Sequence, residues 1–213
     1  MNNPSKAIAQ PKTKRELEYF IETETKQFGN RCDLNHIDVS LITDLSFLFE
    51  SKEFNGNISK WDVSNAVDME HTFTRSDFKG DISNWNVSKV KNTANMFSFS
   101  KFNSDISKWD VSSVVTMAAM FYDSKFNKDI SKWNVSSVKR MGWIFGGSKF
   151  YGDISSWNTV SLNESDYMFV DSKIDKKLGM ENPSFEQVKS HFLNLLLHSG
   201  LKKAKIKTPK ARL

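Results

Sequence analysis

The chain has 213 residues, of which 38% are hydrophobic and 13% aromatic. This is enough apolar material for a packed interior and argues against a disordered chain. A single cysteine, Cys32, excludes an internal disulfide framework. The net charge of +5 is uneven, because residues 201–213 hold six basic side chains and no acid, which leaves −1 for the rest. We therefore do not expect the body to be a surface for a phosphate backbone.

The first element predicted is a helical cap over residues 13–33, preceded by a flexible N-terminus at 1–12. Thr13 and Glu16 have the spacing of a capping box. Three apolar residues follow at helical spacing: Leu17, Phe20 and Ile21. Gly29 is a suitable end for this helix. Repeat arrays need such caps, because a terminal repeat would otherwise expose its apolar face.

A 24-residue repeat dominates the middle of the chain. Five tryptophans recur at this interval: Trp61, Trp85, Trp109, Trp133 and Trp157. The surrounding residues keep the same register, as in FNGNISKWDVS, FKGDISNWNVS, FNSDISKWDVS and FNKDISKWNVS. Ile37 takes the place of the tryptophan one cycle earlier. We predict about six repeats over residues 34–178.

The spacing within one repeat predicts its local structure. Ile58, Trp61 and Val63 have the spacing of a leucine-rich-repeat core, and alternation places Trp61 and Val63 on one face of a strand. The predicted strands lie near residues 60–64, 84–88, 108–112, 132–136 and 156–160. The apolar residues that follow each strand are spaced more like a helical turn. We expect an α/β solenoid, a leucine-rich-repeat-like right-handed array with a short parallel strand per repeat, buried tryptophans and helical caps at both ends.

A second helical cap is predicted over residues 179–200. Ser184 and Gln187 have capping-box spacing, and His198-Ser199-Gly200 is the predicted end. An apolar stripe lies between them: Val188, Phe192, Leu195 and Leu196. The alternative is that this helix docks onto a partner, because an uncovered stripe would be an exposed apolar patch. Residues 201–213 form a basic tail.

The phrases FNxDISxWDVSxV and MxxMF resemble the repeats of the BspA-like leucine-rich-repeat family, which is also found in mycoplasma surface lipoproteins. The resemblance covers roughly residues 34–178. It implies a bacterial surface protein that adheres to proteins of a host or a neighbouring cell. The N-terminal residues contain neither the apolar run of a signal peptide nor a lipid-attachment cysteine. As written, the sequence predicts a cytoplasmic chain, whereas the resemblance implies the cell surface or delivery to a host by a non-classical route.

Known catalytic patterns are missing from the sequence, so we expect no enzyme, metal or cofactor. The four histidines lack zinc-site spacing, and there is no P-loop, dinucleotide fingerprint or nucleophile elbow. One acidic column precedes the repeated isoleucines: Asp81, Asp105, Asp129 and Asp153. We predict that these aspartates bond backbone amides in turns. Calcium binding and carbohydrate hydrolysis are the alternatives.

The predicted binding surface is the outward side of the strands, where both charge signs are interleaved. It comprises Lys60, Asp62, Asn84, Asn86, Lys108, Asp110, Lys132, Asn134 and Asn158. Such a surface suits a protein partner, although the same residues also suit plain solubility. The tail offers a second candidate, for nucleic acid or an acidic surface, through Lys202, Lys203, Lys205, Lys207, Lys210 and Arg212. The leading hypothesis is a protein-binding module, adhesin-like or an intracellular or phage-encoded inhibitor or scaffold. The alternatives are nucleic-acid association through the tail and a carbohydrate-active protein that uses the aspartate column.

Overall fold

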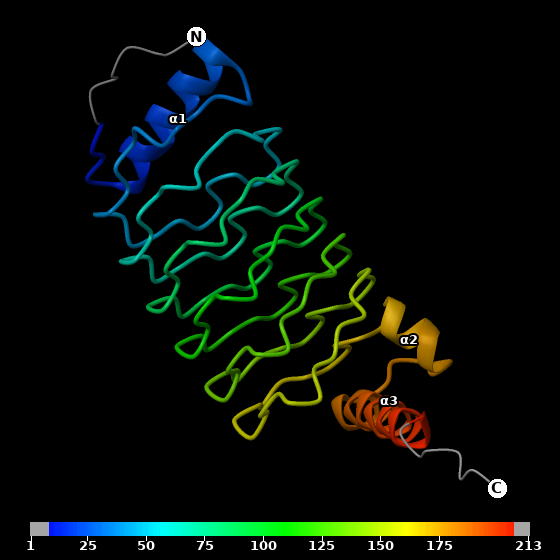
Figure 1. Cartoon of the computed structure of the whole chain (residues 1–213). Coiled ribbons are helices and arrows are strands. Elements are labelled where there is room, and N and C mark those ends of the chain that lie inside the picture. Colours follow the sequence, from blue (N-terminus) through cyan, green and yellow to red (C-terminus); the bar gives the residue numbers. More distant parts are fainter. Residues whose placement is uncertain (1–8, 207–213) are drawn as a thin grey trace, which may run out of the picture.

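The computed structural model describes residues 9–206, and the side chains of residues 9–199. The chain winds in successive coils that stack along one axis (Figure 1). Helix α1 (Lys14–Phe28) covers the first coil, and α2 (Lys173–Leu178) and α3 (Phe185–Ile206) lie at the other end. The coils repeat every 24 residues, because parallel bridges join positions 24 apart: Asp44, Asp68, Asn92, Thr116, Arg140 and Glu164. Each coil therefore buries its apolar side against its neighbours.

Most backbone hydrogen bonds between coils lie in one stretch of each cycle, which we call the ladder segments. They comprise residues 43–51, 67–75, 91–99, 115–123, 139–147 and 163–171. Alternate amides cross to the next coil, as in Phe97 N–H to the Met120 carbonyl at 2.9 Å. The amides between them close turns within their own segment, as in Ser98 N–H to the Asn95 carbonyl at 3.0 Å. The ladder segments thus use their backbone groups both locally and between coils.

The strands were expected elsewhere, and that placement is wrong. The tryptophans lie in what we call the Trp segments, residues 57–64, 81–88, 105–112, 129–136 and 153–160. Among the described residues one bridge touches these segments, at Asn57, and the other bridges lie outside them. Side chains satisfy their amides locally, since Asp105 accepts the Ser107 N–H at 2.8 Å and Asp110 accepts the Ser112 N–H at 3.0 Å. Such local bonds compete with a sheet ladder. The coils pair instead through the segments expected to be helical, and the bridges in the described residues are isolated rather than part of named strands.

The core consists of stacked aromatic columns. The five repeated tryptophans are buried, as predicted, with at most 4% of their surface exposed. The Trp109 indole N–H donates to the Ile82 carbonyl of the preceding coil at 3.1 Å, and the other four repeat this bond. Phe97 stacks on Phe121 with 5.8 Å between ring centroids, and on Phe102 of its own cycle at 4.2 Å. Neighbouring coils are therefore joined by aromatic packing as well as by backbone bonds.

Helix α1 caps the array as the sequence predicts. Thr13 Oγ1 accepts the Glu16 N–H at 3.2 Å, Gly29 ends the helix, and Leu17 and Ile21 are buried against the first coil. Residues 1–8 lie outside the described range. The expected flexible stretch 1–12 is wrong for its last residues, because Ala9 is tied to the first coil. Its carbonyl accepts the Asp38 N–H at 2.7 Å, and its own N–H donates to the His36 carbonyl at 3.2 Å.

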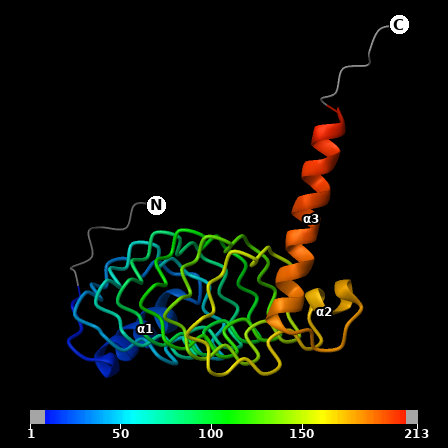
Figure 2. The same ribbon diagram turned by 90° about the horizontal axis from the view of Figure 1, so that it is seen from below.

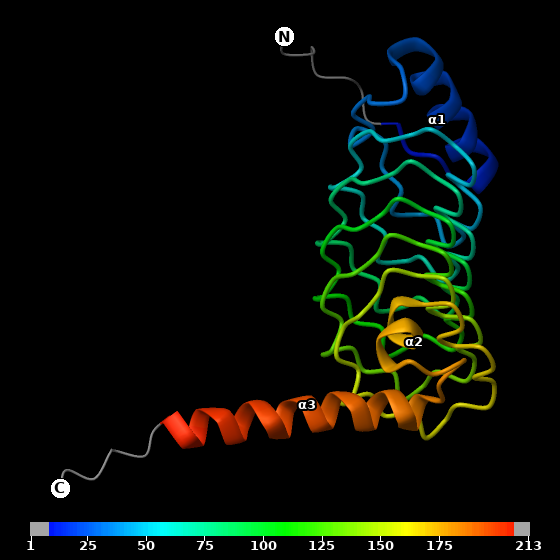
Figure 3. The same cartoon turned by 90° about the vertical axis from the view of Figure 1, so that its right-hand side faces the viewer.

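Helix α3 caps the array only with its first turns. Ser184 and Gln187 exchange both bonds of a capping box, at 2.8 and 3.3 Å. Its buried side chains are Phe185, Val188 and Phe192. Leu195 and Leu196, predicted to continue this stripe, are about half exposed, and the helix runs past Gly200 to Ile206. Figures 2 and 3 show the reason: α3 projects from the end of the array, so its later turns have no coil beneath them.

Candidate partner-binding surfaces

The outward residues predicted from the sequence, which we call the polar face, are all exposed. Five of the nine accept the backbone N–H two residues later, at 3.0–3.2 Å: Asp62, Asn86, Asp110, Asn134 and Asn158. Bonds from the side chain and backbone of Ser112 lower the pKa of Asp110 below its ordinary value. These five side chains therefore have a structural task in the turn after each tryptophan, which already accounts for their repetition.

The aspartate column has the turn role predicted for it. Asp81, Asp105, Asp129 and Asp153 each accept a serine N–H two residues later, at 2.8–2.9 Å. The same bonds lower the pKa of the first three. The described part of the chain contains no group of three or more histidine, cysteine or acidic side chains placed to hold a metal ion. The turn role thus explains this column without a metal.

A continuous row of exposed or half-buried aromatic side chains crosses the ladder segments, and we call it the aromatic row. Phe99 meets Tyr122 edge to face at 5.2 Å, Tyr122 meets Trp143 at 5.6 Å, and Trp143 stacks on Tyr167 at 4.7 Å. The Arg75 guanidinium lies 4.8 Å from the Phe99 ring centroid. Phe99, Trp143 and Tyr167 are 40–49% exposed. These rings form a partly apolar surface that crosses several coils.

The backbone beneath the aromatic row is strained. Each ladder segment has two residues with positive φ, four positions apart: Phe47, Ser51, His71, Arg75, Asn95, Phe99, Ala119, Asp123, Trp143, Gly147, Tyr167 and Asp171. Glycine adopts this left-handed conformation most easily, and a large side chain there costs on the order of 1 kcal/mol. The chain nevertheless has aromatic residues at four of these positions. Because the left-handed pair recurs in every ladder segment, it is a regular feature of the coil, on which the side chain can differ from one repeat to the next.

A smaller aromatic pair lies at the N-terminal end of the ladder segments. Phe47 stacks on His71 at 4.8 Å, and the Lys14 ammonium lies 5.7 Å from the Phe47 centroid. His71 also lies 3.8 Å from Glu50 and 3.9 Å from Glu70. Phe47 is 46% exposed. This pair has a charged setting, unlike the longer aromatic row.

Sequence reasoning did not find the aromatic row. It relied on columns that are the same in every repeat, whereas the row draws on three columns that differ from one repeat to the next. Trp143 and Tyr167 belong to one column, Arg75 and Phe99 to a second, and Tyr122 to a third. Trp143 is the one tryptophan outside the 24-residue series. That departure, in a column between apolar core positions, was the available signal.

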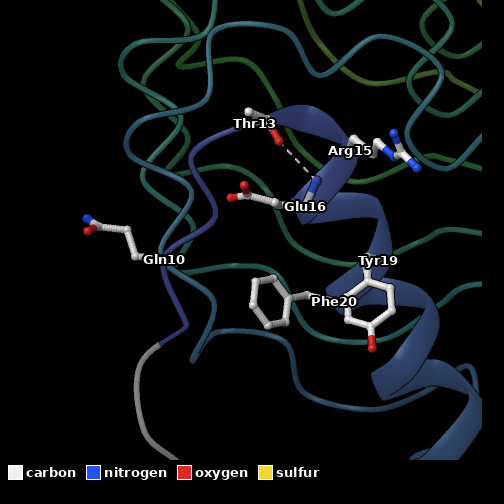
Figure 4. A pocket seen from close by; sticks show the side chains of 6 residues that line it. All are labelled: Gln10, Thr13, Arg15, Glu16, Tyr19 and Phe20. Atoms are coloured by element: carbon white, nitrogen blue, oxygen red, sulfur yellow. Dashed lines mark hydrogen bonds between the residues drawn. The ribbon is translucent and has the colours of Figure 1, made fainter.

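A shallow pocket of about 410 Å³ lies beside α1 (Figure 4). Thr13, whose Oγ1 accepts the Glu16 N–H, lies with Glu16 at one end of it, and Tyr19 and Phe20 line the other end. Its polar groups serve the start of the helix, because Glu16 also accepts the Lys12 N–H at 2.7 Å. The pocket is therefore best explained as part of the N-terminal cap.

The predicted polyanion-binding tail is only partly covered by the structure. Lys202, Lys203 and Lys205 lie in the last turns of α3, where side chains are not described. Lys207, Lys210 and Arg212 lie outside the described residues. The role of this tail stays a prediction. Within residues 9–206, none of the helices combines the length and apolar character needed to cross a membrane.

Comparison with known families gives one match. The family described as "Mycoplasma protein of unknown function, DUF285" matches residues 17–123 and again residues 78–182. The two matches overlap and together run from α1 to just before α3. Two matches within one chain are consistent with a family of repeats. Searches of curated proteins and of solved structures gave no match.

Proposed function

This chain belongs to the DUF285 family, and from that premise we propose that it is a protein-binding module rather than an enzyme. It acts through the surface of a leucine-rich-repeat-like α/β solenoid. The resemblance to BspA-like repeats supports a partner on a host or neighbouring cell. An intracellular target that the module inhibits or scaffolds is the other form of the same proposal.

The aromatic row is the observation that carries this proposal. Exposed tyrosine, tryptophan and arginine side chains are enriched where protein interfaces concentrate their binding energy. Each member of the row contacts the next, so their orientations are largely set before a partner arrives. The members in order are Arg75, Phe99, Tyr122, Trp143 and Tyr167. A preorganised surface loses less conformational entropy on binding. The row spans several coils, which suits an extended segment of a partner protein.

The polar face is the competing surface for the same function. It is exposed and carries Lys60, Lys108 and Lys132. Five of its six carboxylate and amide members, all but Asn84, are engaged in turns, so it offers fewer groups whose task is unexplained. We therefore place the main contact at the aromatic row.

The test compares the two surfaces on one partner. The full chain is used to capture proteins from extracts of the source organism and of cells that it meets, and the captured protein is purified and titrated. Replacing Trp143 and Tyr167 by serine should weaken its affinity about 30-fold or more, the usual effect of losing a central aromatic contact. Replacing Lys108, Asp110 and Lys132 by serine is the matched control and should change affinity less than about threefold. The reverse result would assign the function to the polar face, and an unchanged affinity in both variants would exclude both surfaces.

A further inference from the structure

A cleft of about 470 Å³ near the C-terminal end of the array has an unusual set of charges. Its walls carry four lysines and two asparagines: Lys125, Lys149, Lys173, Lys176, Asn103 and Asn127. Gly147 and Ser148 complete it, and none of the lining residues is an acid. The cleft belongs neither to the aromatic row nor to the polar face. Its electrostatic character is that of a site for an anion.

The neutral groups of the cleft also present hydrogen-bond donors. Asn103 Oδ1 accepts the Asn127 N–H, and Asn127 Oδ1 accepts the Tyr151 N–H, both at 2.8 Å. With both carbonyl oxygens engaged, the side-chain NH₂ groups are the polar groups left to meet a ligand. Ser148 is 2% exposed, and its oxygen accepts the Phe150 N–H at 3.3 Å, which leaves its hydroxyl proton to donate. The cleft therefore offers donors to an acceptor ligand.

The lysines belong to a column that changes character along the array. Lys101, Lys125, Lys149 and Lys173 are 24 residues apart, and the two preceding members are Glu53 and Asp77. Lys101 pairs with Asp77 at 2.6 Å, which lowers the pKa of that carboxyl.

The later members of the column lack such a partner. In the part of the chain that the structure describes, no carboxylate lies within 4.0 Å of the ammonium groups of the cleft. The Lys173 ammonium lies instead 5.7 Å from the centroid of the Tyr151 ring. Like charges in neighbouring coils repel each other. An anionic ligand would relieve this repulsion.

We propose that this cleft binds a short acidic segment of the protein partner, through a few carboxylates. Exposed acids limit the length of the anionic stretch. Asp123 and Asp171, both exposed, flank the cleft residue Gly147 in its column. A strand of nucleic acid carries a charge at every nucleotide and would meet these acids, whereas a short run of carboxylates fits between them. The inference rests on the proposed function in one respect, that the segment belongs to a protein.

The experiment uses a fluorescein-labelled hexaglutamate peptide, a hexathymidylate of single-stranded DNA and a neutral hexaglutamine peptide, each titrated by fluorescence anisotropy. The full chain is compared with a cleft variant, Lys125→Gln, Lys149→Gln and Lys176→Gln. The control variant removes the same charge from the polar face: Lys60→Gln, Lys108→Gln and Lys132→Gln. Titrations run at low salt and at about 150 mM ionic strength. Thermal melts verify that both variants stay folded. This is expected because all six substituted lysines are exposed.

The cleft variant should bind hexaglutamate about tenfold more weakly than the unmodified chain does. The control variant should lose less than about threefold in affinity. Hexaglutamine should bind none of the three proteins. Equal losses in both variants would show attraction by net charge alone and overturn the proposal. A larger loss for hexathymidylate than for hexaglutamate in the cleft variant would also overturn it and assign the cleft to nucleic acid. Because these probes do not need the aromatic row, failure of the proposed function would not produce any of these results.

Discussion

The polar face and the aromatic row lie on the same repeats, yet they arise in different ways. On the polar face, aspartate or asparagine recurs after every tryptophan because its side chain accepts a backbone amide in a turn. In the columns that supply the aromatic row the fold sets the backbone but not the side chain, since Asn95 and Ala119 have the same left-handed backbone as Trp143 in its column. A column that the fold requires tends to be uniform among repeats, whereas a column that the fold leaves free can vary. In this chain the variable columns are therefore the better indicator of a binding surface.

The largest expected effect concerns two tryptophans with opposite environments. Trp109 is 4% exposed and donates its indole N–H to Ile82, whereas Trp143 is 40% exposed. Trp109→Ala should lower the free energy of unfolding by about 3–5 kcal/mol, the usual cost of truncating a buried aromatic residue. Trp143→Ala should lower it by about 1 kcal/mol or less. Urea denaturation of both variants measures the difference, and similar losses would show that Trp143 belongs to the core.

The next effect concerns partner affinity, for which we expect the exposed Trp143 to matter more than the buried Trp109. Trp143→Ala should weaken partner affinity by about 2 kcal/mol, roughly 30-fold, because it removes the exposed ring that joins Tyr122 to Tyr167 in the aromatic row. Trp143→Phe keeps an aromatic surface at the same position and should lose less. Calorimetric titration of the purified partner measures both. A loss for Trp143→Phe as large as that for Trp143→Ala would mean that ring packing is not what the partner recognises.

A smaller effect tests the backbone under the aromatic row. Ala119 has a φ of 52°, whereas its neighbour Ala118 is not among the residues with positive φ. Ala119→Gly should raise the free energy of unfolding by about 0.5 kcal/mol, because relief of strain exceeds the added freedom of the unfolded chain. Ala118→Gly should lower it by about 0.5–1 kcal/mol. Thermal melts of the pair measure the sign, and destabilisation by both substitutions would show that the left-handed positions carry little strain.

The sequence was sufficient for the parts of the fold that depend on side-chain spacing. The 24-residue register predicted the buried tryptophans, and the capping boxes predicted the starts of α1 and α3. The inter-coil pairing was misplaced, because alternation at Trp61 and Val63 resembles a strand although Asp62 closes a turn there. The left-handed positions could not be recognised from the sequence, since only one of the twelve in the ladder segments, Gly147, is a glycine. The aromatic row and the lysine cleft depend on which columns become neighbours, and that requires the coiled structure.

The smallest effect concerns the turns beside the Trp segments and their dependence on pH. The backbone N–H of Ser107 donates to Asp105 and lowers the pKa of its carboxyl below the ordinary value, and Ser83 and Ser131 do the same for Asp81 and Asp129. A carboxyl whose folded pKa is depressed adds stability that is present above its unfolded pKa and lost as pH falls through the folded pKa. The array should therefore lose stability below about pH 4 as the aspartate carboxylates in these turns are protonated.

Substitutions at Asp105 separate the hydrogen bond from the charge. Asp105→Asn keeps an acceptor, as Asn57 does in the same column, so it should leave stability at neutral pH nearly unchanged and slightly reduce the loss of stability in acid. Asp105→Ala removes the acceptor and should be less stable than the unmodified chain at neutral pH, with the gap narrowing in acid. Urea midpoints at about pH 7 and about pH 3 distinguish these cases, and an Asp105→Asn midpoint as low as that of Asp105→Ala at neutral pH would show that the negative charge matters more than the bond to Ser107.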